Sequence, residues 1–207
     1  MSPDKEAKIG PGGLVLVVGP SGCGKDTLLS GARANLADRS ECVFPKRMIT
    51  RPSDPESEDS IEISRQEFAA MRLSGECCVC WEAHGLGYAL PNSIVGDLEA
   101  GRIVIFNCSR SVLPNLARRF QNTLVVQLTV PRDVLNARLR ARGRETEEDI
   151  RERLNRGGFE LPSDISSIEI DNSGTRDIGS KVLADAITDF HRSILKQTTT
   201  SKSKAHS

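Results

Sequence analysis

One segment restricts the possible folds of this chain more than any other. Residues 19–27 read G-P-S-G-C-G-K-D-T, directly after an apolar run at residues 14–18 and directly before a helical pattern. Glycines let a backbone turn so that successive N–H groups point at phosphate oxygens, and a helix N-terminus adds positive potential. Lys25 is then placed to reach the outer phosphates. A glycine-rich turn without a ligand is the alternative, and the flanking strand and helix patterns favour a phosphate-binding loop.

The loop departs from its usual pattern at one position. Asp26 follows Lys25 where the motif expects the Ser or Thr that holds Mg²⁺, and Thr27 comes one residue later. A carboxylate can still serve Mg²⁺, directly or through water, because this ion prefers oxygen ligands. We therefore expect Asp26 to lie on the metal side of the site. The alternative role is a helix cap, for which Asn is about as good as Asp.

Short apolar runs alternate with helical patterns along the chain. Strands are predicted at residues 14–18, 103–106, 124–130 and 167–170. Helices are predicted at residues 26–37, 64–74, 111–120, 132–142, 146–156 and 177–195. Continuous apolar runs are typical of strands buried on both faces, so the alternation predicts an α/β fold with a central parallel β-sheet covered by helices.

The pattern predicts one domain at residues 11–195. Residues 1–10 and 196–207 fall outside the predicted core and are expected to be disordered tails, since the second stretch has almost no apolar content to offset its ordering entropy. Residues 49–89 interrupt the alternation with a polar loop, a short helix and a Cys/Trp-rich strand. We interpret them as a small inserted subdomain.

Charge and composition argue against several kinds of partner. The 28 Lys and Arg residues balance 28 Asp and Glu residues, which disfavours nucleic-acid binding through bulk electrostatics. No apolar run approaches the roughly 18 residues of a membrane span, and residues 1–10 do not resemble a signal peptide. We expect a cytoplasmic protein that acts on a small molecule, without nucleic-acid or membrane partners. The oligomeric state is left open.

The six cysteines are expected to be reduced thiols, because the chain shows no export signal. Cys77, Cys78 and Cys80 lack a second Cys/His pair at zinc spacing and are expected to be buried strand residues. Cys23 lies inside the phosphate loop near a helix N-terminus, where thiol pKa is lowered. It is either a reactive thiol that Mg-ATP protects from alkylation or a small residue that fills space.

Seven arginines fall within residues 138–156. Pairs at i,i+4 such as Glu147 and Arg151 favour a solvated helix, in which each pair contributes about 0.2–0.5 kcal/mol. The alternative is a lid whose arginines close over the transferring phosphoryl group and stabilise its spread negative charge. Beside a phosphate-binding loop, Arg142 and Arg153 are the strongest candidates for such a lid.

These motifs resemble those of the guanylate-kinase-like P-loop kinases, with G-P-S-G-C-G-K near the start and R-G-R-E-T-E-E-D-I-R-E-R-L as the lid. The runs M-I-T-R-P, W-E-A-H-G-L-G-Y, N-C-S-R-S-V-L-P and I-D-N-S-G, with G-K-D in the loop, are similar to one branch, the ribose 1,5-bisphosphate phosphokinases of bacterial phosphonate catabolism. The resemblance spans residues 14–187. It implies that ATP, with Mg²⁺, phosphorylates ribose 1,5-bisphosphate to 5-phosphoribosyl 1-diphosphate.

The motifs and the resemblance together assign roles to individual residues. Catalysis is expected from Lys25, Asp26, Arg142 and Arg153, with Asp26 beside the metal. The nucleotide is expected to contact Gly19, Pro20, Ser21, Gly22, Cys23, Gly24, Lys25, Asp26, Thr27 and Asn172. The sugar phosphate is expected to contact Arg51, Glu58, Tyr88, Asn107 and Arg110, with Arg47 and His84 as further candidates. No general base is required, because a phosphate with a second pKa of about 6 is largely ionised at neutral pH.

Three positions depart from guanylate kinases and favour a sugar acceptor. Asp54 stands in place of a second phosphate-binding arginine, Val79 in place of the acidic residue that reads guanine, and Asn107 in place of a strand-end aspartate. Glu82 lies close enough to Val79 to blur that assignment. A GMP kinase and a non-catalytic guanylate-kinase-like interaction module stay as alternatives, although Lys25 argues against the module. Cys108 and Ala89 stand where the phosphokinase branch usually has glycine.

Overall fold

The computed structural model describes residues 8–52, 60–83, 85–142, 148 and 165–204. Its strands are β1 (Ile9–Val18), β2 (Cys42–Val43), β3 (Arg47–Ile49), β4 (Ser60–Glu62), β5 (Cys77–Ala83), β6 (Leu86–Pro91), β7 (Ile103–Asn107), β8 (Phe120–Thr129) and β9 (Ser166–Asp171). Its helices are α1 (Lys25–Asn35), α2 (Arg65–Ser74), α3 (Ser93–Glu99), the 3-10 turn η1 (Arg110–Val112), α4 (Leu113–Arg119), α5 (Arg132–Arg142) and α7 (Arg176–Lys204). The helix predicted at residues 146–156 lies outside the described residues, apart from Glu148.

Five parallel strands form the main sheet in the order β2-β7-β1-β8-β9. The central strand β1 carries an unbroken apolar run, Leu14 to Val18, that is fully buried. The predicted α/β fold with a parallel sheet covered by helices is therefore confirmed. The sequence pattern missed β2, because two residues are too few to show a period.

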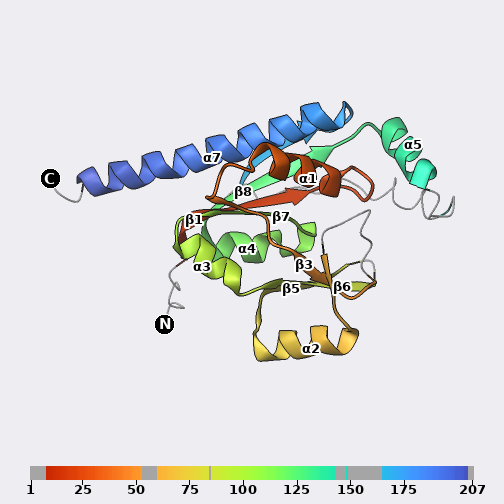
Figure 1. Ribbon diagram of the computed structural model, residues 1–207, viewed down its shortest axis with the longest axis horizontal. Helices are drawn as coiled ribbons and strands as arrows, with labels where there is room; N and C mark the ends of the chain where they lie inside the picture. Colours follow the sequence, from red (N-terminus) through yellow and green to blue (C-terminus); the bar gives the residue numbers. More distant parts are fainter. Residues whose placement is uncertain (1–7, 53–59, 84, 143–147, 149–164, 205–207) are drawn as a thin grey trace.

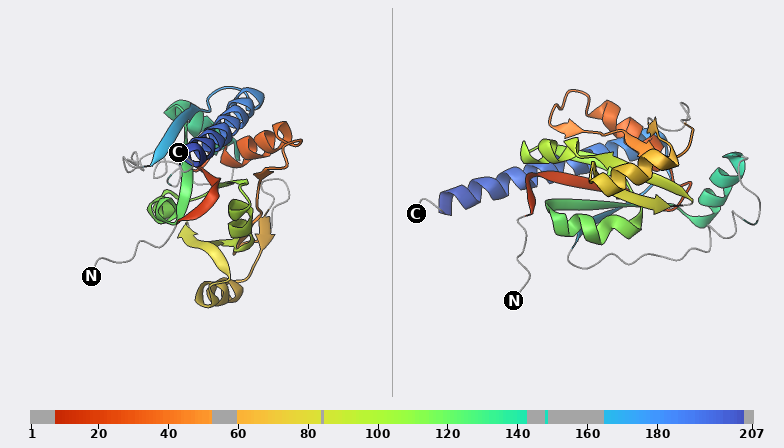
Figure 2. Two further views of the ribbon diagram at one scale, coloured as in Figure 1. Left: turned by 90° about the vertical axis from the view of Figure 1, so that its left-hand side faces the viewer. Right: turned by 90° about the horizontal axis from the view of Figure 1, so that it is seen from below.

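Alternate residues of β1 face two different helical layers. Leu14 and Leu16 pack in the cluster that includes α3 and α4, whereas Val15 and Val17 pack in the cluster that includes α1 and α7. Figures 1 and 2 show these two layers on opposite faces of the main sheet. Because the strands are parallel, all their carboxyl ends lie at one edge, where the loop after β1 is found.

A second sheet, in the order β4-β3-β6-β5, lies below the main sheet in Figure 1. The strands β5 and β6 form an antiparallel hairpin, and β3 pairs with both β6 and β4. The helix α2 packs outside this sheet, with Phe68 buried against Gly87. Its start is fixed by Ser64, whose hydroxyl accepts from the Glu67 N–H at 3.1 Å while Glu67 accepts from the Ser64 N–H at 2.6 Å. The sequence predicted α2 and one strand here; the structure adds three short strands.

The expectation of reduced thiols is wrong for one pair. Cys77 and Cys80 form a disulfide, whereas Cys23, Cys42, Cys78 and Cys108 are free. Residues three apart lie on opposite faces of a regular strand, but the register of β5 shifts between Cys77 and Val79. A bulge adds one residue to one strand, and it brings the two thiols to the same face.

Both predicted tails are partly ordered. Ile9 pairs with Phe120 at the start of the main sheet, so β1 begins within residues 1–10. The helix α7 continues to Lys204, well past residue 195. Extending a helix that is already packed costs far less than nucleating one, and the hydroxyls of Thr198, Thr199 and Thr200 donate to carbonyls one turn earlier. Among the described helices, none is both long and apolar enough to cross a membrane.

Candidate active site at the carboxyl ends of the central strands

The glycine-rich loop joins the end of β1 to the start of α1, where a phosphate-binding loop is expected. Gly24 is the N-cap of α1 and adopts the left-handed conformation, with φ of 90°. A Cβ at this position would lie 2.7 Å from the Asn172 amide nitrogen, so both the backbone conformation and the space require glycine. The Lys25 ammonium lies over the loop and donates to the carbonyls of Gly19 at 3.0 Å and Pro20 at 2.9 Å.

Asn172, which follows the edge strand β9, supports the loop. It is buried, and its backbone N–H donates to the Thr129 carbonyl at 2.9 Å. Its side-chain amide donates to the Cys23 carbonyl at 2.7 Å. The contact observed for Asn172 is therefore with the loop backbone, which it holds in place; the predicted contact with the nucleotide stays a prediction.

Asp26 lies in the first turn of α1 and does not cap it, because Gly24 occupies the N-cap. Its Oδ1 atom accepts from the Asn107 side-chain amide at 2.6 Å and lies 3.5 Å from Nη2 of Arg47. Asn107 ends β7, is buried, and pairs with Val17 of β1. Parallel pairing of β7 with β1 thus brings Asn107, which stands in place of a strand-end aspartate, next to Asp26.

The residues around Asp26 fit a magnesium ion held mainly by a nucleotide. Mg²⁺ is usually bound by one or two carboxylates together with substrate phosphates and waters. The Asp26 side chain is 42% exposed, so its carboxylate is open to solvent while Oδ1 is held by Asn107 and Arg47. Within the described ranges, no group of three or more His, Cys, Asp or Glu residues could hold a metal by itself.

The second sheet presents an aromatic pair and several arginines to the same region. Tyr88 of β6 stacks on Trp81 of β5, with ring centroids 5.2 Å apart and planes at 7°. The Arg47 guanidinium lies 5.5 Å from the centre of the Tyr88 ring. Arg51 follows β3, next to Thr50, whose backbone N–H donates to the Gly87 carbonyl of β6.

The structure describes only some of the other predicted site residues. Arg110 begins η1 just beyond β7, whose last residue Asn107 pairs with Val17 shortly before the loop. Only the backbone of Arg142 is described, at the end of α5. Glu58, His84 and Arg153 lie outside the described residues. The lid and its arginines therefore stay a prediction.

Among the described positions that distinguish guanylate kinases, the one expected to hold the acidic guanine reader is apolar. Val79 is 5% exposed and packs in the apolar core. Glu82 pairs with Arg72 of α2 at 3.4 Å, on the surface. The two positions that depart from the phosphokinase branch, Ala89 and Cys108, are buried, and burial raises the pKa of the Cys108 thiol to about 12.

Cys23 is the residue for which the two sequence interpretations predicted opposite chemistry. Its side chain is fully buried, and a Cβ on Gly19 would lie 2.8 Å from its sulfur. Burial raises the pKa of the Cys23 thiol, against the smaller lowering effect of the Lys25 charge. The lowered pKa expected for Cys23 is therefore wrong, and the burial favours the alternative, a small residue that fills space under the loop.

We expect Cys23 to resist alkylation in the folded protein. At pH 8 a thiol whose pKa is raised holds little thiolate, and the thiolate is the reacting form. Iodoacetamide labelling followed by mass spectrometry should show Cys23 modified at least about tenfold more slowly in the native protein than in guanidinium chloride. The half-buried Cys42, whose thiol pKa is also raised by burial, provides an internal comparison that should react faster than the fully buried Cys23. Equal rates in the native and unfolded protein would contradict the burial.

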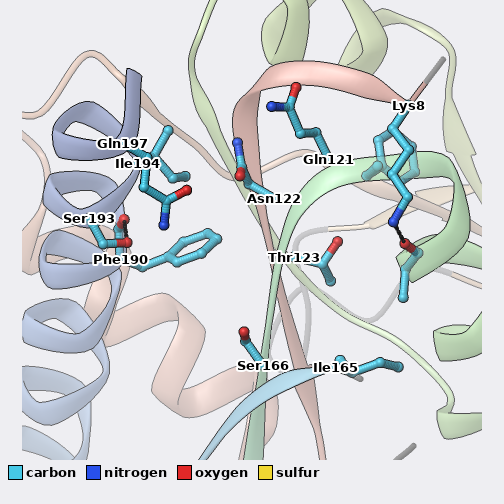
Figure 3. A pocket seen from close by; sticks show the side chains of 12 residues that line it. Lys8, Gln121, Asn122, Thr123, Ile165, Ser166, Phe190, Ser193, Ile194 and Gln197 are labelled. Atoms are coloured by element: carbon cyan, nitrogen blue, oxygen red, sulfur yellow. Dashed lines mark hydrogen bonds between the residues drawn. The ribbon is translucent and has the colours of Figure 1, made fainter. Parts of the chain in front are cut away.

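A separate cavity of about 450 Å³ lies at the other edge of the main sheet, where the strands begin (Figure 3). It is bordered by Lys8 before β1, by residues 120–123 of β8, by Ser166 of β9 and by the second half of α7. The phosphate-binding loop follows the opposite end of β1. This cavity is therefore not part of the candidate active site.

Comparisons with known proteins bear on which enzyme this site belongs to. An AAA domain family model matches residues 15–156. Ribose 1,5-bisphosphate phosphokinase PhnN from Bradyrhizobium diazoefficiens is 45% identical over 187 residues, which cover 90% of this chain and 93% of that protein. The chain belongs to the ribose 1,5-bisphosphate phosphokinase family. Its G-K-D loop and its buried Val79 are thus features of a phosphokinase family member.

Two further matches are a longer bifunctional protein and a solved structure. The bifunctional ribose 1,5-bisphosphokinase-thymidine phosphorylase of Cupriavidus pinatubonensis is 44% identical over 176 residues, which cover 85% of this chain but 29% of that protein. This phosphokinase family member therefore spans under a third of the bifunctional relative. A guanylate kinase from Anaplasma phagocytophilum has a similar structure, with a TM-score of 0.60 at 15% identity, covering 88% of this chain and 87% of that one. That likeness shows a shared fold.

Proposed function

We propose that this protein transfers the γ-phosphoryl group of ATP to ribose 1,5-bisphosphate, giving ADP and 5-phosphoribosyl 1-diphosphate. One observation supports this assignment most directly. The phosphate-binding loop faces a second sheet with Tyr88 and nearby arginines, and the position for an acidic guanine reader holds the buried Val79. Among the described residues, such a site has cations for phosphates and an apolar side chain where a guanine reader would carry a carboxylate.

The proposed reaction needs little covalent chemistry from the protein. An oxygen of the acceptor's 1-phosphate forms a bond to the γ-phosphorus, and the bond from that phosphorus to the β,γ-bridging oxygen breaks, leaving ADP. The attacking phosphate is largely ionised at neutral pH, so no residue has to remove a proton. Positioning and charge neutralisation then account for most of the rate.

The described residues of the site have separate roles in this proposal. The loop N–H groups bind the phosphates, and the Lys25 ammonium moves from the loop carbonyls to the outer phosphates. Bound Mg²⁺ would neutralise charge on the β- and γ-phosphates, with Asp26 as its side-chain oxygen donor. Tyr88, Asn107, Arg51 and Arg110 bind the acceptor.

Three further residues, whose side chains the structure does not describe, complete the proposal. Arg142 and Arg153 close over the transferring group as a lid, and Glu58 contributes to the acceptor site. ATP as co-substrate is consistent with a cytoplasmic reaction.

A parallel assay tests the choice of acceptor. We expect kcat/KM for ribose 1,5-bisphosphate to exceed that for GMP at least about 100-fold, because the position of the acidic guanine reader holds the apolar Val79 and gives a base no partner there. Product formation from each acceptor should be followed with MgATP, with Lys25→Ala as the control for contaminating kinases. A higher kcat/KM for GMP would overturn the assignment, and no transfer to either acceptor would favour a non-catalytic module.

A further inference from the structure

We infer that Arg47 is a positioning residue that couples the metal side of the nucleotide site to the aromatic pair of the acceptor site. The sequence offered Arg47 only as a further acceptor ligand. This inference rests on the proposed function in one respect, that the second sheet binds the acceptor.

Arg47 contacts three elements at once. It begins β3, and its side chain is 11% exposed. Its Nη1 donates to the Asn107 carbonyl at 3.2 Å, and its Nη2 lies 3.5 Å from Asp26 Oδ1. Its guanidinium lies 5.5 Å from the Tyr88 ring centre. It therefore connects β7 of the main sheet and the helix α1 with β6 of the second sheet.

A guanidinium is suited to this position in a way that an ammonium is not. Its planar fork of five N–H donors can serve two acceptors while its face stacks on an aromatic ring. The contact with a ring also strengthens when the cation is desolvated, as the low exposure of Arg47 implies. Lysine would keep the charge but could not satisfy the three partners together.

The charge of Arg47 also explains how Asp26 can stand next to phosphates. A carboxylate beside a triphosphate is repelled, and an opposite charge within hydrogen-bonding range offsets that repulsion. Asn107 and Arg47 both hold Oδ1 of Asp26. The orientation of Asp26 is thereby tied to the position of the Tyr88 ring through a single side chain.

Trp81 of the aromatic pair provides a fluorescence signal for this coupling. Tyr88 stacks on Trp81, which is the single tryptophan of the chain. The contacts run from Asp26 through Arg47 and Tyr88 to Trp81, so an event at Asp26 should alter the fluorescence of the indole. This signal requires neither an acceptor nor turnover.

The first experiment titrates MgATP without acceptor and follows Trp81 emission, with nucleotide occupancy measured separately by equilibrium dialysis. We expect most of the emission change at saturation to be lost in Arg47→Met, because the substitution removes the contacts that join Asp26 to the Tyr88 ring. The matched control is Arg33→Met. The Arg33 guanidinium also donates to a backbone carbonyl, at 2.8 Å, and lies 5.8 Å from a ring centre, both of Phe44. An unchanged response in Arg47→Met, at equal occupancy, would overturn the inference.

The second experiment measures the Mg²⁺ concentration for half-maximal rate in Asp26→Asn, Arg47→Met and the double variant. If Arg47 acts through Asp26, we expect Arg47→Met to raise that concentration roughly fivefold or more in the wild-type background and to have a much smaller effect beside Asp26→Asn. Independent, additive effects would refute a positioning role. Arg47→Lys serves where Arg47→Met fails to fold, and it should keep the charge while losing most of the Trp81 response.

The two proposals fail in distinguishable ways. If the wild type does not phosphorylate ribose 1,5-bisphosphate, the proposed function fails, while the fluorescence response to MgATP still tests Arg47. If the wild type turns over normally and Arg47→Met keeps the Trp81 response and the Mg²⁺ dependence, only the inference about Arg47 fails.

Discussion

Replacing Lys25 with alanine is expected to lower kcat about 10²- to 10³-fold, which is the range for losing one preorganised group that stabilises transition-state charge. The Lys25 ammonium already lies at the loop, bonded to the carbonyls of Gly19 and Pro20, so it has only to turn to meet the outer phosphates. A coupled ADP-release assay would measure the loss, and circular dichroism would show that the fold persists.

The matched control is Lys181→Ala. Lys181 also sits on a helix, but it is largely exposed and pairs with Asp185 at 2.9 Å, far along the sequence from the loop. Exposed pairs of this kind contribute little to stability, so the control should keep normal kcat. A near-normal kcat in Lys25→Ala would remove the basis for treating residues 19–27 as a phosphate-binding loop.

The second large effect is expected at Asp26. Asp26→Asn should raise the Mg²⁺ concentration for half-maximal rate and lower kcat, by about tenfold to 100-fold, with a smaller effect on acceptor KM. The substitution keeps the size of the side chain and removes the charge that Mg²⁺ and Arg47 both use. Steady-state rates over a range of Mg²⁺ at fixed ATP would measure it.

Asp133→Asn is the control for helix effects, because Asp133 also lies in the first turn of a helix, α5. An acidic residue there interacts with the helix dipole, and its loss should leave the Mg²⁺ dependence unchanged. If Asp26→Asn behaves like Asp133→Asn, the carboxylate has no role at the metal.

The loop could be predicted because everything that defines it is local. The glycines, Lys25 and the adjoining strand and helix are contiguous in sequence, and α5 was predicted at its observed bounds. The sequence placed Asp26 on the metal side and Asn107 at the strand end, but it did not predict that their side chains are in contact. The geometry of that contact comes from parallel pairing of β1 with β7, which no local pattern encodes.

The features that escaped prediction depend on distant partners. Arg47 acquires its role from α1, β7 and β6, and a two-residue strand such as β2 exists only because β7 provides its edge. The Cys23 prediction was wrong because a local influence, the helix N-terminus, is outweighed by burial that tertiary packing creates. The disulfide of Cys77 and Cys80 depends on a bulge that alternation alone cannot show.

The placement of the two sheets along the sequence also orders events during synthesis on the ribosome. The second sheet uses only residues from β3 to β6, so its hairpin can pair as soon as Pro91 has emerged. The strand β1 is made first, yet Leu14 pairs with Val104 and Thr123, so the central strand of the main sheet gains its neighbours late. Long-range parallel pairings form slowly. We therefore expect the nascent chain to pair the β5–β6 hairpin while β1, the strand before the glycine-rich loop, is still unpaired.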